Sequence, residues 1–217
     1  MTQITLIRHG QANFGAKTEE GYDKLSPLGH QQAEWLGEYM RATGAVFDHV
    51  HHGTLRRQRE TAEGMNLGLT RSEDARLNEI KYLHMATAFN QQSGMTMPET
   101  GKEFAAHVPH LFNAWAAGDL DHVHPTYTDF AQQMTDVVGE ALAMGGHHVF
   151  VTSGGVIGMM IAQLLALPPS GYAAMMLPIR NTSIHRFGIA ERGLYLEEYN
   201  MTPHLDHANR ANARTYV

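Results

Sequence analysis

An apolar run near the start of the chain, residues 4–7, ends in an abrupt change of chemistry. Its side chains favour a buried β-strand, and Arg8, His9 and Gly10 follow at once. A strand that delivers these residues and then turns on a glycine places them at the mouth of a sheet, where open α/β sheets bind their ligands. The segment therefore predicts a site in which an imidazole and a guanidinium act together.

An imidazole at such a position can attack phosphorus, and a guanidinium beside it can bind phosphate oxygens through bidentate hydrogen bonds. An Arg-His-Gly triplet also occurs by chance, and a histidine at a strand end is commonly a surface residue. Other segments must therefore supply the rest of a phosphate pocket.

The composition narrows the class of protein. A chain of 217 residues, 43% hydrophobic and 18% charged, fits a soluble globular enzyme with one core, which we expect to be a single domain over residues 1–217. It has no cysteine, which excludes thiol catalysis and cysteine-bound zinc. The formal charge of −6 argues against a nucleic-acid partner. With no recognisable signal peptide and no apolar stretch longer than 156–167, we expect a cytoplasmic protein without membrane contact.

Strand-like runs alternate with helix-like segments along the whole chain. This order predicts a three-layer α/β/α fold around a mixed, mostly parallel sheet. Residues 75–77 are expected as a short strand, and 183–189 with 194–199 as a hairpin. The segment of about 80–125 is expected as a helical insertion or lid.

Three predicted strands end in polar or glycine-rich residues, at 8–10, 52–54 and 153–155. The carboxyl ends of parallel strands share one edge of a sheet, so these groups can converge. Arg57, one turn into the helix after the second strand, would join Arg8 and His9 there.

Backbone N–H groups at such turns and at a helix N-terminus favour an anion. We therefore assign phosphate binding to Gly10, Ser153, Gly154 and Gly155, together with the two arginines.

Four fragments in this order resemble the histidine phosphatase superfamily, in its phosphoglycerate-mutase-like branch. They are the Arg-His-Gly triplet, residues 25–33 (LSPLGHQQA), residues 55–62 (LRRQRETA) and residues 77–79 (LNE). The resemblance covers nearly the whole chain.

The resemblance implies a mechanism. His9 would attack phosphorus and become phosphohistidine, while Arg8 and Arg57 stabilise the charge on the phosphoryl oxygens. Glu79 would protonate the leaving oxygen and later activate water. The arginines supply the electrostatic stabilisation, so no metal or cofactor is expected, and the partner is a small phosphorylated substrate.

One position departs from the family. Where the family reads His-Gly at the end of the fourth pocket strand, this chain has Ser153 followed by Gly154. A serine offers a hydrogen bond but no positive charge. The expected function is phosphomonoester hydrolysis through phosphohistidine, and the alternative is a weakly active or inactive relative that only binds phospho-ligands.

A second alternative is a serine hydrolase. Residues 151–155 (VTSGG) miss a Gly-x-Ser-x-Gly nucleophile elbow only at its first glycine. Asp206 with His185 or His207 could complete a triad around Ser153, but this interpretation leaves the arginines and Glu79 without a role.

The sequence does not identify the substrate. Specificity is expected to depend on residues 11–25 and 80–125, which match no motif. The sequence also leaves a homo-oligomer open.

Overall fold

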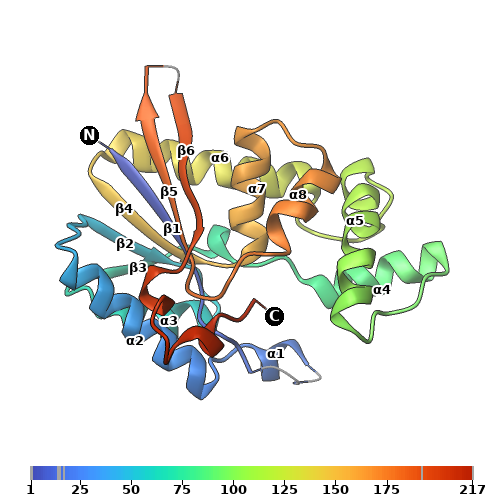
Figure 1. The fold of residues 1–217 in the computed structure, drawn as a ribbon. Coiled ribbons are helices and arrows are strands. Elements are labelled where there is room, and N and C mark those ends of the chain that lie inside the picture. The colour runs from blue at the N-terminus through green and yellow to red at the C-terminus, as the bar shows by residue number, and fades with distance from the viewer. Residues whose placement is uncertain (1, 14–15, 17, 192, 217) are drawn as a thin grey trace.

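A six-stranded sheet forms the centre of the protein in the computed structural model, which describes residues 2–13, 16, 18–191 and 193–216 (Figure 1). The strand order is β3-β2-β4-β1-β5-β6. The strands are β1 (Gln3–Arg8), β2 (His49–His52), β3 (Arg71–Glu73), β4 (His147–Thr152), β5 (Ile184–Ala190) and β6 (Gly193–Met201).

Strand pairing is parallel from β3 through β1 and antiparallel in the β1–β5 and β5–β6 pairs. Arg8 at the end of β1 lies opposite Thr152 at the end of β4, and His52 at the end of β2 lies opposite Val151. The predicted mixed sheet is therefore confirmed, and its parallel strands end side by side. The predicted hairpin is formed by β5 and β6.

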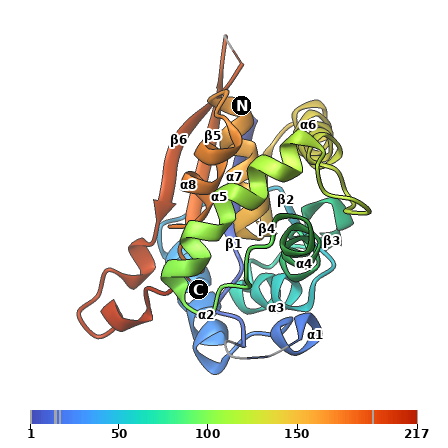
Figure 2. The same cartoon turned by 90° about the vertical axis from the view of Figure 1, so that its right-hand side faces the viewer.

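Helices cover both faces of the sheet, which gives the predicted three layers (Figures 1 and 2). On one face, α2 and α3 pack against Ile7, Val149 and Val151. The opposite face is covered by α4 to α8, and α5 crosses in front of α7 and α8 in Figure 2. The helices are α1 (Glu19–Tyr22), α2 (Pro27–Ala42), α3 (Arg56–Met65), α4 (Tyr82–Ser93), α5 (Gly101–Ala117), α6 (Tyr127–Met144), α7 (Gly154–Leu164) and α8 (Pro169–Met176).

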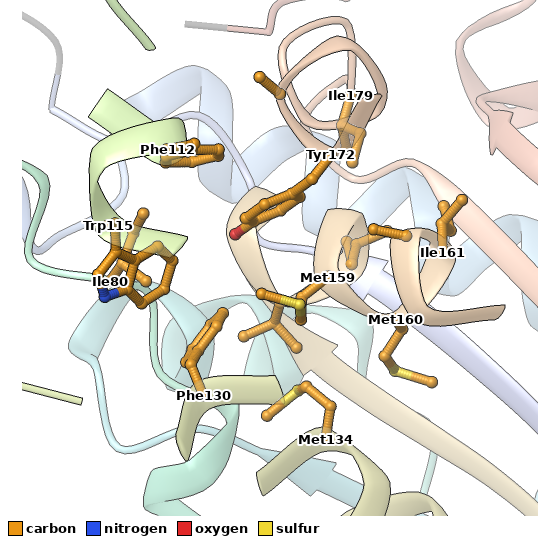
Figure 3. Close-up of a cluster of buried hydrophobic side chains, with 14 of the residues drawn as sticks. Ile80, Phe112, Trp115, Phe130, Met134, Met159, Met160, Ile161, Tyr172 and Ile179 are labelled. Carbon is orange, nitrogen blue, oxygen red and sulfur yellow. The ribbon is translucent and has the colours of Figure 1, made fainter. Parts of the chain in front are cut away.

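The larger core lies under α5, α7 and α8 (Figure 3). Phe112 of α5 stacks on Tyr172 of α8 with ring centroids 4.4 Å apart, and both side chains are fully buried. Aromatic side chains bury large areas, so this stack fixes α5 against α8. Phe130 and Met134 of α6 extend the same core.

Helix starts follow the capping signals of the sequence. Ser26 caps α2 by accepting the N–H of Gly29 at 3.0 Å. Thr100 and Thr126 form capping boxes at the starts of α5 and α6. Each side-chain oxygen satisfies an N–H that has no partner within the helix.

The predicted insertion consists of α4 and α5, and α5 continues through Pro109. The strand predicted at 75–77 was wrong. Ala75–Leu77 is a 3₁₀ helix, and β3 precedes it at Arg71–Glu73. The physical reason is Asp74, whose carboxylate accepts the N–H of Arg76 at 2.9 Å and so favours a tight turn over an extended chain.

No helix within the described residues is long and apolar enough to cross a membrane.

Several imidazoles are buried in the neutral form. Burial lowers the pKa of His185 to about 3 and that of His204 to about 4. His185 is fully buried and donates from Nε2 to Ser183 Oγ at 2.9 Å. Burial also lowers the pKa of three further buried histidines, His9, His107 and His148.

These histidines predict acid sensitivity. In the unfolded chain each imidazole takes up a proton near pH 6.5, whereas the folded protein resists protonation until lower pH. The free energy of unfolding should therefore be constant above about pH 7. It should fall between about pH 6.5 and 4, by up to ~1.4 kcal/mol per pH unit for each fully buried histidine. Chemical unfolding at half-unit pH intervals measures this slope.

His185→Gln should make the slope shallower, because one titrating group is removed. The exposed His207→Gln should leave it unchanged. Equal stability at pH 7 and pH 5 in the parent protein would contradict the prediction.

Candidate active site

His9 lies immediately after β1 with its imidazole 2% exposed. Its Nδ1 is 2.7 Å from the carbonyl oxygen of Gly10, which can only accept, so Nδ1 carries the hydrogen. Its Nε2 is 3.2 Å from Nε of Arg57, which can only donate, so Nε2 carries the lone pair. The two contacts fix one tautomer, with Nε2 unprotonated and held toward a guanidinium.

The charge state of His9 agrees with this tautomer. Burial, and then the positive charges of Arg57 and Arg8, lower the pKa of His9 well below 6.5, although the hydrogen bond to Gly10 acts in the opposite direction. The imidazole is therefore neutral at physiological pH, which is the form that acts as a nucleophile.

Arg57 lies in the first turn of α3 and is 6% exposed. Its guanidinium donates to Asp23 at 2.9 Å and lies 5.2 Å from the ring centre of Tyr22. The Asp23 carboxylate also accepts the backbone N–H groups of Arg56 and Arg57, at 3.0 and 3.3 Å. A side chain from the loop after β1 thus caps α3 and orients Arg57 at the same time.

Arg8 is held by the backbone. Its Nη1 donates to the carbonyl oxygens of Ile179 and Tyr216, the latter at 2.6 Å. Its Nε is buried and has no acceptor among the described residues. This atom lies 3.8 Å from the point where a Cβ on Gly154 would stand, at the start of α7. Burial lowers the pKa of Arg8, but a guanidinium stays protonated at any physiological pH.

Glu79 reaches the start of α7 from the chain that follows the 3₁₀ helix. Its carboxylate accepts the N–H of Gly155 at 3.0 Å and that of Ile80 at 3.0 Å. The preceding turn is held by the carbonyl of Leu77, which accepts from Thr152 Oγ1 at 2.6 Å and from Gln58 Nε2 at 2.9 Å. The carboxylate therefore has a fixed position over the N-terminus of α7.

The three glycines assigned to phosphate have different surroundings. The N–H of Gly10 donates to Thr61 Oγ1 at 2.9 Å, and a Cβ there would lie 2.5 Å from the carbonyl oxygen of Gly29. The N–H of Gly155 goes to Glu79, and a Cβ there would lie 2.1 Å from that carboxylate. Gly154 lines the cavity in front of His9. Two of these glycines are thus required for close packing, and Gly154 faces the cavity.

Ser153 is fully buried directly before α7. Its Oγ accepts a hydrogen bond from Gln58 Nε2 at 2.8 Å. Because Gln58 also reaches the carbonyl of Leu77, it connects Ser153 to the turn that carries Glu79.

The groups of the serine-hydrolase alternative are engaged elsewhere. His185 contacts Ser183, Asp206 pairs with Arg214, and His207 is exposed. Within the described part of the chain, no histidine is hydrogen-bonded to Ser153. The structure therefore does not form a Ser-His-Asp triad at this position.

A cavity of about 630 Å³ opens in front of His9, Arg8 and Arg57, and Glu79 also lines it. Other lining residues come from the loop after β1 and from the α4–α5 insertion, the two segments expected to determine specificity. In the residues that the structure describes, no cluster of three or more His, Asp or Glu side chains could hold a metal ion.

Sequence reasoning missed Asp23, Gln58 and the carbonyl of Tyr216. Asp23 stands in a polar loop without a motif, and Gln58 looks like an ordinary helix residue beside Arg57. A backbone carbonyl leaves no trace in the sequence. Asp23 stands two residues before the Leu25-Ser26 helix start, but it caps α3 and not that helix, so its place in the sequence gave no signal for this role.

The family model of the histidine phosphatase superfamily (branch 1) matches residues 4–202. The chain therefore belongs to the histidine phosphatase superfamily. A 61-residue segment is also 38% identical to the mitochondrial serine/threonine-protein phosphatase PGAM5 of Xenopus laevis, and to that of Xenopus tropicalis. That segment is 28% of this chain and 22% of the Xenopus laevis protein, so the chain matches about a fifth of the length of these relatives.

Solved structures show the same fold. Phosphoserine phosphatase from Entamoeba histolytica, in complex with 3-phosphoglyceric acid, has a TM-score of 0.71 and 22% identity over 94% of this chain and 100% of its own. A mycobacterial glucosyl-3-phosphoglycerate phosphatase has a TM-score of 0.64 and 20% identity over 92% of this chain and 99% of its own.

Proposed function

We propose that the protein hydrolyses phosphomonoesters through a phosphohistidine on His9. The observation that carries this proposal is the state of His9 Nε2, which is unprotonated, buried and placed beside the guanidinium of Arg57. Membership of the histidine phosphatase superfamily and the resemblance to named phosphatases support it.

In the first step the lone pair of His9 Nε2 attacks phosphorus, so a P–N bond forms as the P–O bond to the leaving alcohol breaks. Arg57, which donates to Nε2 in the free protein, turns its N–H groups to the phosphoryl oxygens. Arg8 offers its unpartnered Nε to the same oxygens. The two guanidiniums offset the negative charge in the transition state.

Glu79 is the candidate proton donor. Its carboxyl group gives a proton to the leaving oxygen in the first step and takes one from the attacking water in the second. That water breaks the P–N bond, which releases inorganic phosphate and returns His9 to its neutral form. The hydrogen bond from Gly155 and the fixed turn at Leu77 keep the carboxyl group at one place through both steps.

Ser153 supports a second candidate, a relative that binds phospho-ligands with little turnover. The family's second histidine would bring positive charge to the phosphoryl group, whereas the Ser153 hydroxyl is neutral and bonded to Gln58. Arg8 and Arg57 would hold phosphate equally well in a protein that binds it without hydrolysis, so turnover and binding must be measured separately.

The nucleophile can be trapped. Rapid quench with a generic phosphomonoester should give acid-labile, base-stable phosphate on His9, and His9→Asn should abolish both label and turnover. His52→Asn is a matched control, because His52 is also buried at a strand end and bonds the next glycine carbonyl, at 2.9 Å. Label on another residue, or turnover by His9→Asn, would end the phosphohistidine proposal.

The position of Glu79 can be tested through the glycine that makes room for it. Gly155→Ala should displace the carboxylate and lower kcat at least tenfold, since general acid–base catalysis contributes about 10²–10⁴ in rate. Affinity for inorganic phosphate should change little. Gly139→Ala in α6 is the control, because a Cβ there meets no atom within 4 Å. Unchanged kcat in Gly155→Ala would exclude Glu79 in this position as the proton donor.

The histidine that the family has in place of Ser153 can be restored by mutation. Because Gln58 fills the space beside Ser153 Oγ, Ser153→His alone should gain little, whereas Ser153→His with Gln58→Ala makes room for the ring. A well-placed donor is worth about 10²–10³ in rate, so the double variant should raise kcat clearly above that of Gln58→Ala. If parent and double variant bind phosphate equally well and neither turns over, the protein is a binder.

A further inference from the structure

The cavity in front of His9 is much larger than the phosphate site. Arg8, His9, Arg57 and Glu79 line one part of its volume of about 630 Å³, and residues of the α4–α5 insertion line another part. A phosphoryl group held by the arginines leaves this space to the alcohol part of the substrate. The chemistry of the remaining lining therefore determines which alcohols fit.

Apolar side chains form a wall of the remaining cavity. They come from α4 and the chain before it, from α5, and from the end of α8 and the residue after it, and they are Ile80, Leu83, Phe104, Phe112, Met176 and Leu177. Ile80 and Phe112 continue into the large core, which gives this wall a rigid base (Figure 3). Leu83 is 41% exposed, so part of its apolar surface is free to be covered by a ligand.

The charges that the described residues bring to the cavity do not favour an acidic alcohol. Apart from Arg8 and Arg57, Lys81 is the one cationic side chain among the described residues that line the cavity. Three carboxylates, those of Glu20, Asp23 and Glu79, line it as well. Once the two arginines hold the phosphoryl group, Lys81 and Glu20 are left as charges of opposite sign among the described lining residues, so the lining offers a second carboxylate no net positive charge. An apolar group would instead cover apolar wall.

We propose that the substrates are phosphomonoesters of apolar alcohols, with the alkyl or aryl part bound along the wall formed by α4 and α5. This proposal rests on the proposed phosphatase function and adds the substrate class.

A homologous series of alkyl phosphates tests it. Ethyl, butyl, hexyl and octyl phosphate share nearly the same leaving oxygen, so they differ only in apolar length. We expect kcat/KM to rise along the series by up to about fourfold per methylene until the cavity is full. O-phosphoserine and 3-phosphoglycerate should be turned over more slowly than butyl phosphate. A flat or falling series, or a preference for the two carboxylated esters, would overturn the proposal.

Two matched variants locate the effect. Leu83→Asn should reduce the ratio of kcat/KM for octyl over ethyl phosphate by about three- to tenfold, because an apolar contact is lost. Met95→Asn is the control, since Met95 is similarly exposed at 38% but does not line the cavity. It should leave the ratio unchanged. An equal effect of both variants, or none in Leu83→Asn, would contradict an alkyl site at this wall.

Binding separates this proposal from the phosphatase function. Ethylphosphonate and octylphosphonate have no P–O bond to the alkyl group, so calorimetry with them measures the cavity without turnover. Octylphosphonate should bind more tightly, and Leu83→Asn should remove much of the difference. If no alkyl phosphate is hydrolysed but this preference is found, the phosphatase function fails and the apolar site stands. Equal binding of both phosphonates would overturn the apolar site whatever the activity.

Discussion

Parallel pairing between β1 and β4 is the constraint on which the site depends. Arg8 lies opposite Thr152, so the chain leaves both strands at the same level of the sheet. One strand then delivers His9, and the other turns through Ser153 into α7. A shift of this register by one residue would exchange the faces of every side chain in a strand and move His9 away from Arg57. The core on both faces, with Ile4 and Leu6 on one side and Ile7 on the other, holds the register.

Sequence patterns predicted the fold well where local chemistry determines structure. Capping by Ser26 and Thr126 marks helix starts because the side chain itself makes the bond. The strand predicted at 75–77 failed because the side chain of Asp74 turns the chain, and an apolar Leu77 can be buried from a 3₁₀ helix as well as from a strand. Local apolar pattern cannot distinguish these two cases.

The candidate site was predictable to the extent that its residues follow strand ends. His9 and Arg57 were expected together, and the structure places them 3.2 Å apart. The contacts that fix their states come from distant segments and carry no sequence pattern. Asp23 on Arg57 and Gln58 on Ser153 arise only when the loop after β1 and the start of α3 fold against the sheet. Contacts of this kind between distant segments cannot be predicted from local sequence.

Arg8 and Arg57 are held in different ways, one by backbone carbonyls and the other by a carboxylate. Backbone carbonyls of Ile179 and Tyr216 orient Arg8 by their dipoles. A carboxylate orients Arg57 and cancels much of its charge. An arriving dianion therefore meets Arg8, which forms no ion pair within the described residues, and must compete with Asp23 for Arg57. For the proposed phosphatase, this competition would lower the affinity for phosphate below that of two free arginines and ease the departure of inorganic phosphate.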